Sequence, residues 1–131
     1  MVQNWYGPGF EHEPWRPLRP VEQRMLDRLL EDPFPGRDAL RAQLRQARVR
    51  TLDAEGSLAF QVRDGPPAQV ESRTPAGLHW LDAEGTFLEI ILHVRAGWLD
   101  ELEVIWPRGD TGLEWPDPGQ GWLINLPWRD A

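Results

Sequence analysis

The side chains with the most potential for chemistry are two histidines and three glutamates: His79, Glu89, His93, Glu101 and Glu103. Imidazole and carboxylate groups can bind a divalent metal or act as general acids and bases. Carboxylates among apolar residues also suit recognition of a basic protein. A third interpretation is a hydrated sheet face with no ligand. No motif such as His-Glu-x-x-His is present, so no catalytic residue and no cofactor are predicted.

These residues alternate with apolar ones, at the period of two that is typical of strands. Around Arg95-Ala96-Gly97, a two-residue turn would pair Ile90 with Glu103 and place carboxylates on the apolar face. A three-residue turn ending in a left-handed Gly97 pairs Ile90 with Leu102 instead, and we predict this turn. The apolar face is then expected to hold Leu88, Ile90, Leu92, Val94, Trp98, Leu102, Val104 and Trp106.

The opposite face is predicted to gather the five candidate residues on three neighbouring strands. A three-residue turn within 82–85 places His79 opposite Glu89, and the next hairpin places Glu89 opposite Glu103. His93 and Glu101 then lie one diagonal away. Glu89 facing Glu103 is a like-charge pair, which costs stability in a sheet. The apolar residues expected on the same face are Leu81, Phe87, Ile91, Leu99 and Ile105.

The pentapeptide Leu-Asp-Ala-Glu-Gly occurs twice, at 52–56 and at 81–85. Aspartate begins tight turns and glycine accepts the left-handed backbone that closes them. In the first copy, a four-residue loop pairs Val49 with Phe60 and suits the apolar pattern. The repeat therefore predicts two turns rather than a duplicated functional motif.

The fold is predicted to be α+β, with a helical hairpin packed on an antiparallel β-meander of five or six strands. Pro20 suits the first turn of a helix, and apolar residues recur at helical spacing up to Leu30. A Pro/Gly-rich break at 32–36 precedes a second helix over 37–47. Strands are then expected at 47–52, 57–63, 69–74, 76–81, 86–94 and 98–106.

The chain is expected to form a single domain over 1–131. An aromatic, Pro-rich arm at 1–18 precedes the helices at 19–47, and a Trp/Pro/Gly-rich tail at 107–131 follows the meander at 47–106. The arm and tail are expected to cover an edge or part of the second face of the sheet. The tryptophans expected outside the sheet are Trp5, Trp15, Trp115, Trp122 and Trp128.

The second predicted helix carries a basic stripe of Arg37, Arg41, Arg45 and Arg48 on the side opposite its apolar residues. Such a stripe is usually a solvated face. The alternatives are contact with an acidic partner or with carboxylates of the sheet.

Composition excludes several classes of function. A net charge of −7 argues against nucleic acid and against anionic membranes as partners. The absence of cysteine excludes disulfides and thiol chemistry. No apolar stretch reaches the length of a membrane span and no signal peptide is evident, so a cytoplasmic location is expected.

The hairpin Leu-His-Val-Arg-Ala-Gly-Trp-Leu-Asp-Glu-Leu-Glu-Val at 92–104 resembles that of an uncharacterised group of small bacterial α+β proteins, a domain of unknown function. The segment at 34–40 followed by 47–49 is similar to the same group. The resemblance covers about 18–118 and departs in the arm and the tail. It implies no activity and no site residue, but the group resembles small solitary domains that serve as immunity or adaptor proteins.

The function predicted is therefore a non-enzymatic protein-interaction module, immunity-like or adaptor-like, that binds a basic partner through the His/Glu face. The alternative is a small-molecule or divalent-metal-binding domain that uses the same residues. Homodimerisation through the Trp-rich tail is a further possibility.

Overall fold

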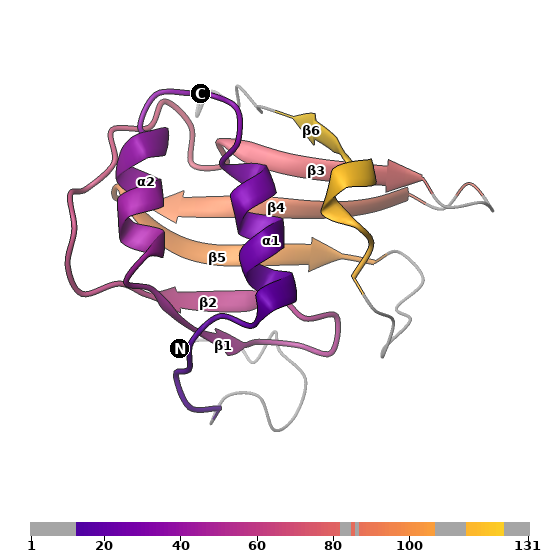
Figure 1. The fold of residues 1–131 in the computed structure, drawn as a ribbon, viewed down its shortest axis with the longest axis horizontal. Coiled ribbons are helices and arrows are strands. Elements are labelled where there is room, and N and C mark those ends of the chain that lie inside the picture. The colour runs from indigo at the N-terminus through magenta and orange to yellow at the C-terminus, as the bar shows by residue number, and fades with distance from the viewer. Residues whose placement is uncertain (1–12, 82–84, 86, 107–114, 125–131) are drawn as a thin grey trace, which may run out of the picture.

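The computed structural model describes residues 13–81, 85, 87–106 and 115–124, which form two α-helices and a six-stranded antiparallel sheet. This confirms the predicted α+β class. Both helices lie on the same face of the sheet (Figure 1). The helices are α1 (Pro20–Leu29) and α2 (Arg37–Leu44), with a short 3-10 helix η1 at Pro118–Gln120. The strands are β1 (Arg48–Thr51), β2 (Leu58–Gln61), β3 (Ala76–Leu81), β4 (Phe87–Arg95), β5 (Trp98–Ile105) and β6 (Trp122–Ile124).

The helices begin where their local signals predict. Pro20 occupies the first turn of α1, and a carboxylate oxygen of Glu22 accepts a hydrogen bond from the backbone N–H of Arg19 at 2.8 Å. Helix α2 follows Gly36, whose φ of +90° suits a residue without a Cβ atom. It ends at Leu44 rather than at Ala47, because the chain passes directly into β1.

The strand order is β1-β2-β5-β4-β3-β6, so the sheet is not the single meander that the sequence predicted. Strands β3, β4 and β5 do follow one another as neighbours. Strand β2, however, pairs with β5, through Leu58 with Leu102 and Ala59 with Glu101. The β1–β2 hairpin therefore docks on the far side of β5, and the predicted pairing of Val49 with Phe60 inside that hairpin is confirmed.

The predicted strand at 69–74 is wrong, since this segment runs past the β4–β5 turn without joining the sheet. Two bonds hold it there: the N–H of Ala68, just before the segment, donates to the carbonyl of Gly97 in the turn at 2.8 Å, and the carbonyl of Arg73 accepts from the N–H of Val94 near the end of β4 at 2.7 Å. The prolines at 66 and 67 have no N–H for a ladder. The long connection from β2 to β3 can therefore cross the end of the sheet, which allows β2 to reach β5.

Segments from both ends of the described chain cover the two edges of the sheet. The N–H and carbonyl of Arg16 bond to the carbonyl and N–H of Val49, each at 2.8 Å, on the outer side of β1. On the other edge, β6 pairs with β3, so Trp122 belongs to the sheet and the prediction that placed it outside is wrong. The predictions made for residues 1–12, 107–114 and 125–131 lie outside the described residues, as does the three-residue turn predicted within 82–85, since 82–84 and 86 are not described.

The β4–β5 turn contains two residues, Ala96 and Gly97, with φ angles of +52° and +88°. The three-residue turn was therefore predicted wrongly. Strand β5 compensates with a bulge, because its pairing shifts by one residue between His93 and Val94. The predicted apolar face is restored beyond the bulge, except that Leu99 is buried in place of Trp98.

Candidate functional site

The second face of the sheet, turned away from the viewer in Figure 1, carries all five candidate residues, and no described helix lies over it. Cross-strand pairing arranges its side chains in rows. Trp122 on β6 pairs with His79 on β3, His79 with Glu89 on β4, and Glu89 with Ile105 on β5. This row places an aromatic residue and a carboxylate on either side of one histidine.

The prediction that His79 lies opposite Glu89 is confirmed. The Nε2 atom of His79 lies 2.5 Å from a carboxylate oxygen of Glu89, and the imidazole ring meets Phe87 edge-on with centroids 4.7 Å apart. This Nε2 atom is buried and makes no hydrogen bond of acceptable geometry within the described residues. The imidazole is therefore fixed between a carboxylate and an aromatic ring.

The predicted pairing of Glu89 with Glu103 is wrong. The bulge in β5 places Glu89 opposite Ile105 and Glu103 opposite Ile91. Each glutamate thus has an aliphatic cross-strand neighbour, and the like-charge repulsion expected from the sequence is avoided.

His93 takes the role of partner to the other two glutamates. It pairs directly with Glu101 across the strands, and its Nε2 atom lies 2.8 Å from Oε1 of Glu103 on the diagonal. The five candidates therefore separate into two contacts, His79 with Glu89 and His93 with Glu103, with Glu101 beside the second.

Glu101 lies half-buried beside His93, and its surroundings shift its pKa upward. Burial raises the pKa of its carboxyl group; the nearby His93 opposes this effect, and the negative charges of Glu103, Asp100 and Asp53 add to it. Within the described part of the chain, this carboxylate accepts no side-chain hydrogen bond, so a positively charged group from outside would be favoured beside it.

The same face carries the exposed apolar side chains of the described chain. Leu81, Phe87 and Trp122 are 56%, 42% and 58% exposed, and they are the large hydrophobic residues most exposed to solvent. Leu81 pairs with Phe87, and Trp122 pairs with His79, so the three surround the same histidine. We call Leu81, Phe87, Trp122 and His79 the aromatic patch. The sequence placed Leu81 and Phe87 on this face but missed Trp122, since a three-residue strand leaves little periodic signal.

The arrangement does not assemble a metal centre. Within residues 13–81, 85, 87–106 and 115–124, no three His, Asp or Glu side chains lie close enough to hold a metal ion. Leu99, which the sequence placed with the apolar residues of this face, is instead buried in the core. Among the described helices, none is long and apolar enough to cross a membrane.

Comparisons of the chain with protein-family models, with curated proteins and with solved structures give no match. The resemblance of the 92–104 hairpin to a group of small bacterial proteins therefore stays a prediction.

Proposed function

We propose that the chain is a cytoplasmic, non-enzymatic protein-interaction module of the immunity or adaptor type, which binds a basic partner through the second face of its sheet. The observation that carries this proposal is the aromatic patch beside Glu89, Glu101 and Glu103. Exposed apolar clusters bordered by polar groups are typical of interaction sites, and aromatic side chains dominate binding energy at such sites.

Charge supports a basic partner in particular. The chain carries 21 acidic and 14 basic residues, so a cationic protein is attracted before contact. The raised pKa of Glu101 supports the same choice, because a cationic side chain placed beside it stabilises the carboxylate form. The carboxylates would thus determine which partner binds, and the aromatic patch would supply most of the affinity.

The test is affinity capture with three immobilised proteins: the wild type, a Phe87→Ser/Trp122→Ser variant and a Glu101→Arg/Glu103→Arg variant. We expect one basic protein on the wild type, and its loss from both variants. A Gln46→Ala variant on the helical side serves as the control and is expected to retain the partner, since Gln46 is exposed there.

The recovered partner is then mixed with each purified variant and the mass of the complex is measured by light scattering. Retention of a partner by both face variants would exclude this face as the interface. Light scattering of the wild type alone measures self-association, and a dimer that Phe87→Ser/Trp122→Ser abolishes would replace the basic partner with a second copy.

A further inference from the structure

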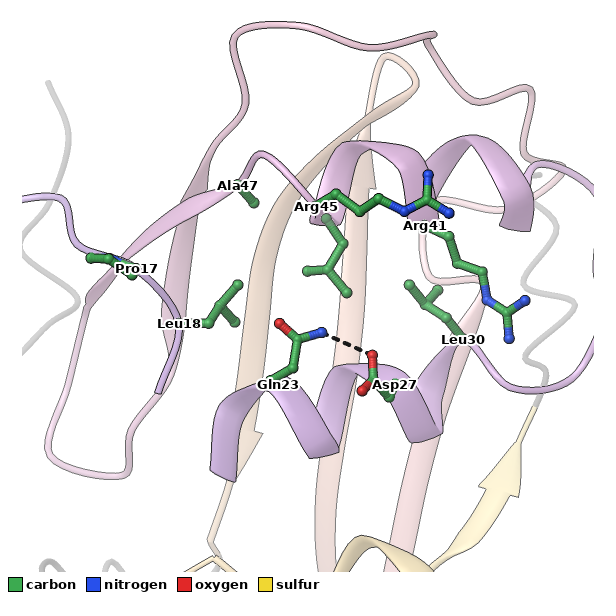
Figure 2. A pocket seen from close by; sticks show the side chains of 9 residues that line it. Pro17, Leu18, Gln23, Asp27, Leu30, Arg41, Arg45 and Ala47 are labelled. Carbon is green, nitrogen blue, oxygen red and sulfur yellow. Dashed lines mark hydrogen bonds between the residues drawn. The ribbon is translucent and has the colours of Figure 1, made fainter. Parts of the chain in front are cut away.

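A groove separates the two helices on the side of the molecule opposite the aromatic patch (Figure 2). Its volume is about 640 Å³, which falls within the range of roughly 300–1,000 Å³ that is typical of small-molecule sites. We call it the interhelix groove. It does not include any of the five His/Glu candidates.

The floor of the interhelix groove is apolar. Leu30 at the end of α1, Leu44 at the end of α2 and Ala47 after it are buried residues of the core, and the half-buried Leu18 packs against them. The three core residues expose almost no surface, so the apolar area that a ligand could cover lies mainly on Leu18 and the exposed Pro17, which also line the groove.

The wall formed by α1 offers hydrogen-bond acceptors. The side-chain amide of Gln23 donates to Oδ1 of Asp27 at 2.9 Å, and this bond orients both groups along the helix (Figure 2). The carbonyl oxygen of Gln23 and the second oxygen of Asp27 keep lone pairs for a ligand. A negatively charged ligand group near this wall would be repelled by Asp27. A hydroxyl or ammonium group of a ligand could instead donate a hydrogen bond to these oxygens.

The wall formed by α2 offers two guanidinium groups, those of Arg41 and Arg45, one helical turn apart. Both side chains extend toward the end of the groove where Leu30 lies (Figure 2). Within the described part of the chain, neither group makes a side-chain hydrogen bond or an ion pair, although the protein is strongly acidic. Arg37, in the same predicted stripe, differs: it pairs with Asp38 at 3.0 Å and donates to the carbonyl of Glu31 at 2.8 Å.

We propose that the interhelix groove binds a small-molecule carboxylate with an apolar body, with the carboxylate held by Arg41 and Arg45 and the apolar body lying along the groove toward Leu18. A guanidinium presents parallel donors that match the two oxygens of a carboxylate, which favours this group over a point anion. Asp27 lies on the facing wall and would repel a negative charge there. The ligand is therefore expected to carry one negative charge, at the end that meets α2.

The probe for this site is 3-phenylpropanoate, titrated into the full chain and followed by the methyl NMR signals of Leu30 and Leu44. Saturable shifts are expected at these methyl groups, with little change at Phe87. The neutral analogue 3-phenylpropanamide has the same apolar body without the charge, and we expect it to bind about tenfold more weakly or less.

Three variants separate the groove from general electrostatic attraction. Arg41→Gln and Arg45→Gln are each expected to weaken binding of 3-phenylpropanoate by about tenfold or more. Arg48→Gln removes the same charge from an exposed residue outside the groove, and we expect it to bind like the wild type. Arg45→Lys keeps the charge without the parallel donors and should be intermediate.

Equal binding of the amide and the carboxylate would overturn the proposal, as would equal weakening by Arg48→Gln and Arg45→Gln, or shifts located away from the groove. Arg45 is exposed, so its substitution tests the site even where Arg41→Gln lowers stability.

Discussion

The backbone N–H of Leu99 donates to the side-chain oxygen of Gln43, 2.9 Å away, so a buried residue of α2 serves as a partner for β5. The side-chain nitrogen of the same residue donates to the carbonyls of Gly97 at 2.9 Å and Pro66 at 2.8 Å. Gln43 is fully buried and joins a helix, a turn and a loop. Gln43 therefore fixes the β4–β5 turn and the start of β5. The bulge in this part of β5 determines the cross-strand neighbour of each carboxylate.

Replacing Gln43 with alanine is expected to lower the free energy of unfolding by about 2–4 kcal/mol, because the buried N–H of Leu99 and the carbonyl of Pro66 lose their partner and the carbonyl of Gly97 keeps only the N–H of Ala68. Urea unfolding followed by tryptophan fluorescence measures this change. Gln46→Ala removes the same side chain from an exposed position and should change stability by less than about 0.5 kcal/mol. Equal effects of the two substitutions would contradict a structural role for the buried amide.

Glu22 makes a bidentate contact with Arg16, with both oxygen–nitrogen distances at 2.8 Å. Burial alone would raise the pKa of Glu22, but hydrogen bonds from Arg16 and from the N–H of Arg19, together with the charge of Arg16, hold its pKa below the ordinary value. The carboxylate thus adds stability above the ordinary pKa, and this contribution is lost as the pH falls through the lowered pKa.

Glu22→Gln is therefore expected to cost about 1.5–3 kcal/mol at neutral pH and to flatten the acid side of the stability curve. Unfolding midpoints measured over a pH series provide the test. Glu31→Gln breaks a more exposed pair with Arg28 and should cost at most about 1 kcal/mol. The same acid profile in wild type and Glu22→Gln would show that this pair does not contribute.

Glu101 is expected to behave in the opposite sense. Its pKa is raised, first by burial, so between the ordinary and the raised pKa the folded state binds a proton more tightly than the unfolded state does. Charging Glu101 therefore costs stability above the raised pKa and nothing below the ordinary one. Glu101→Gln should raise the unfolding midpoint at neutral pH and have no such effect in acid, whereas the exposed Glu71→Gln should have little effect at either pH. A destabilised Glu101→Gln at neutral pH would contradict this assignment.

Gly121 lies against the indole of Trp80, and a Cβ atom there would approach the ring to 2.6 Å. Trp80 also donates its Nε1–H to the carbonyl of Asp117 at 3.0 Å, so the ring cannot move without losing that bond. Gly121→Ala is expected to destabilise by about 1–3 kcal/mol and to alter the tryptophan emission. At Gly119 the nearest atom lies at 3.5 Å, and Gly119→Ala should be nearly neutral by the same measurement.

Divalent metals are expected to leave the melting temperature unchanged, because the described residues bring no three His, Asp or Glu side chains together. A metal that bound only the folded state would raise the melting temperature. Thermal unfolding with and without Zn²⁺, Mn²⁺ or Mg²⁺ makes the comparison. A metal-dependent increase that His79→Gln or His93→Gln abolishes would favour the alternative in which the histidines are ligands.

Local signals predicted much of this fold. The two helices begin after Arg19 and Gly36 as expected, and the pairing of His79 with Glu89 was predicted correctly from the alternation of polar and apolar residues in the two strands. The pairing of β2 with β5 could not be predicted in the same way, since it joins residues distant in the chain. It depends on a loop that does not pair as a strand and is held instead by one bond to the β4–β5 turn and one to the end of β4.

The bulge in β5 explains why the candidate site was predicted only in part. A two-residue turn followed by one extra residue leaves Leu102 and Val104 on the core face, as a three-residue turn also does. The apolar pattern therefore cannot distinguish the two. The two turns differ only in the cross-strand partners that they produce. Glu103 was predicted to lie opposite Glu89, but it lies opposite Ile91.

The position of β5 between β4 and β2 has a consequence for synthesis on the ribosome. Because the chain emerges from its N-terminus, the β1–β2 hairpin leaves the ribosome before the strand that it must pair with exists. One edge of β2 therefore stays unpaired until β5 has been translated. We expect chaperones to bind this exposed edge, or nascent chains to pair with one another through it.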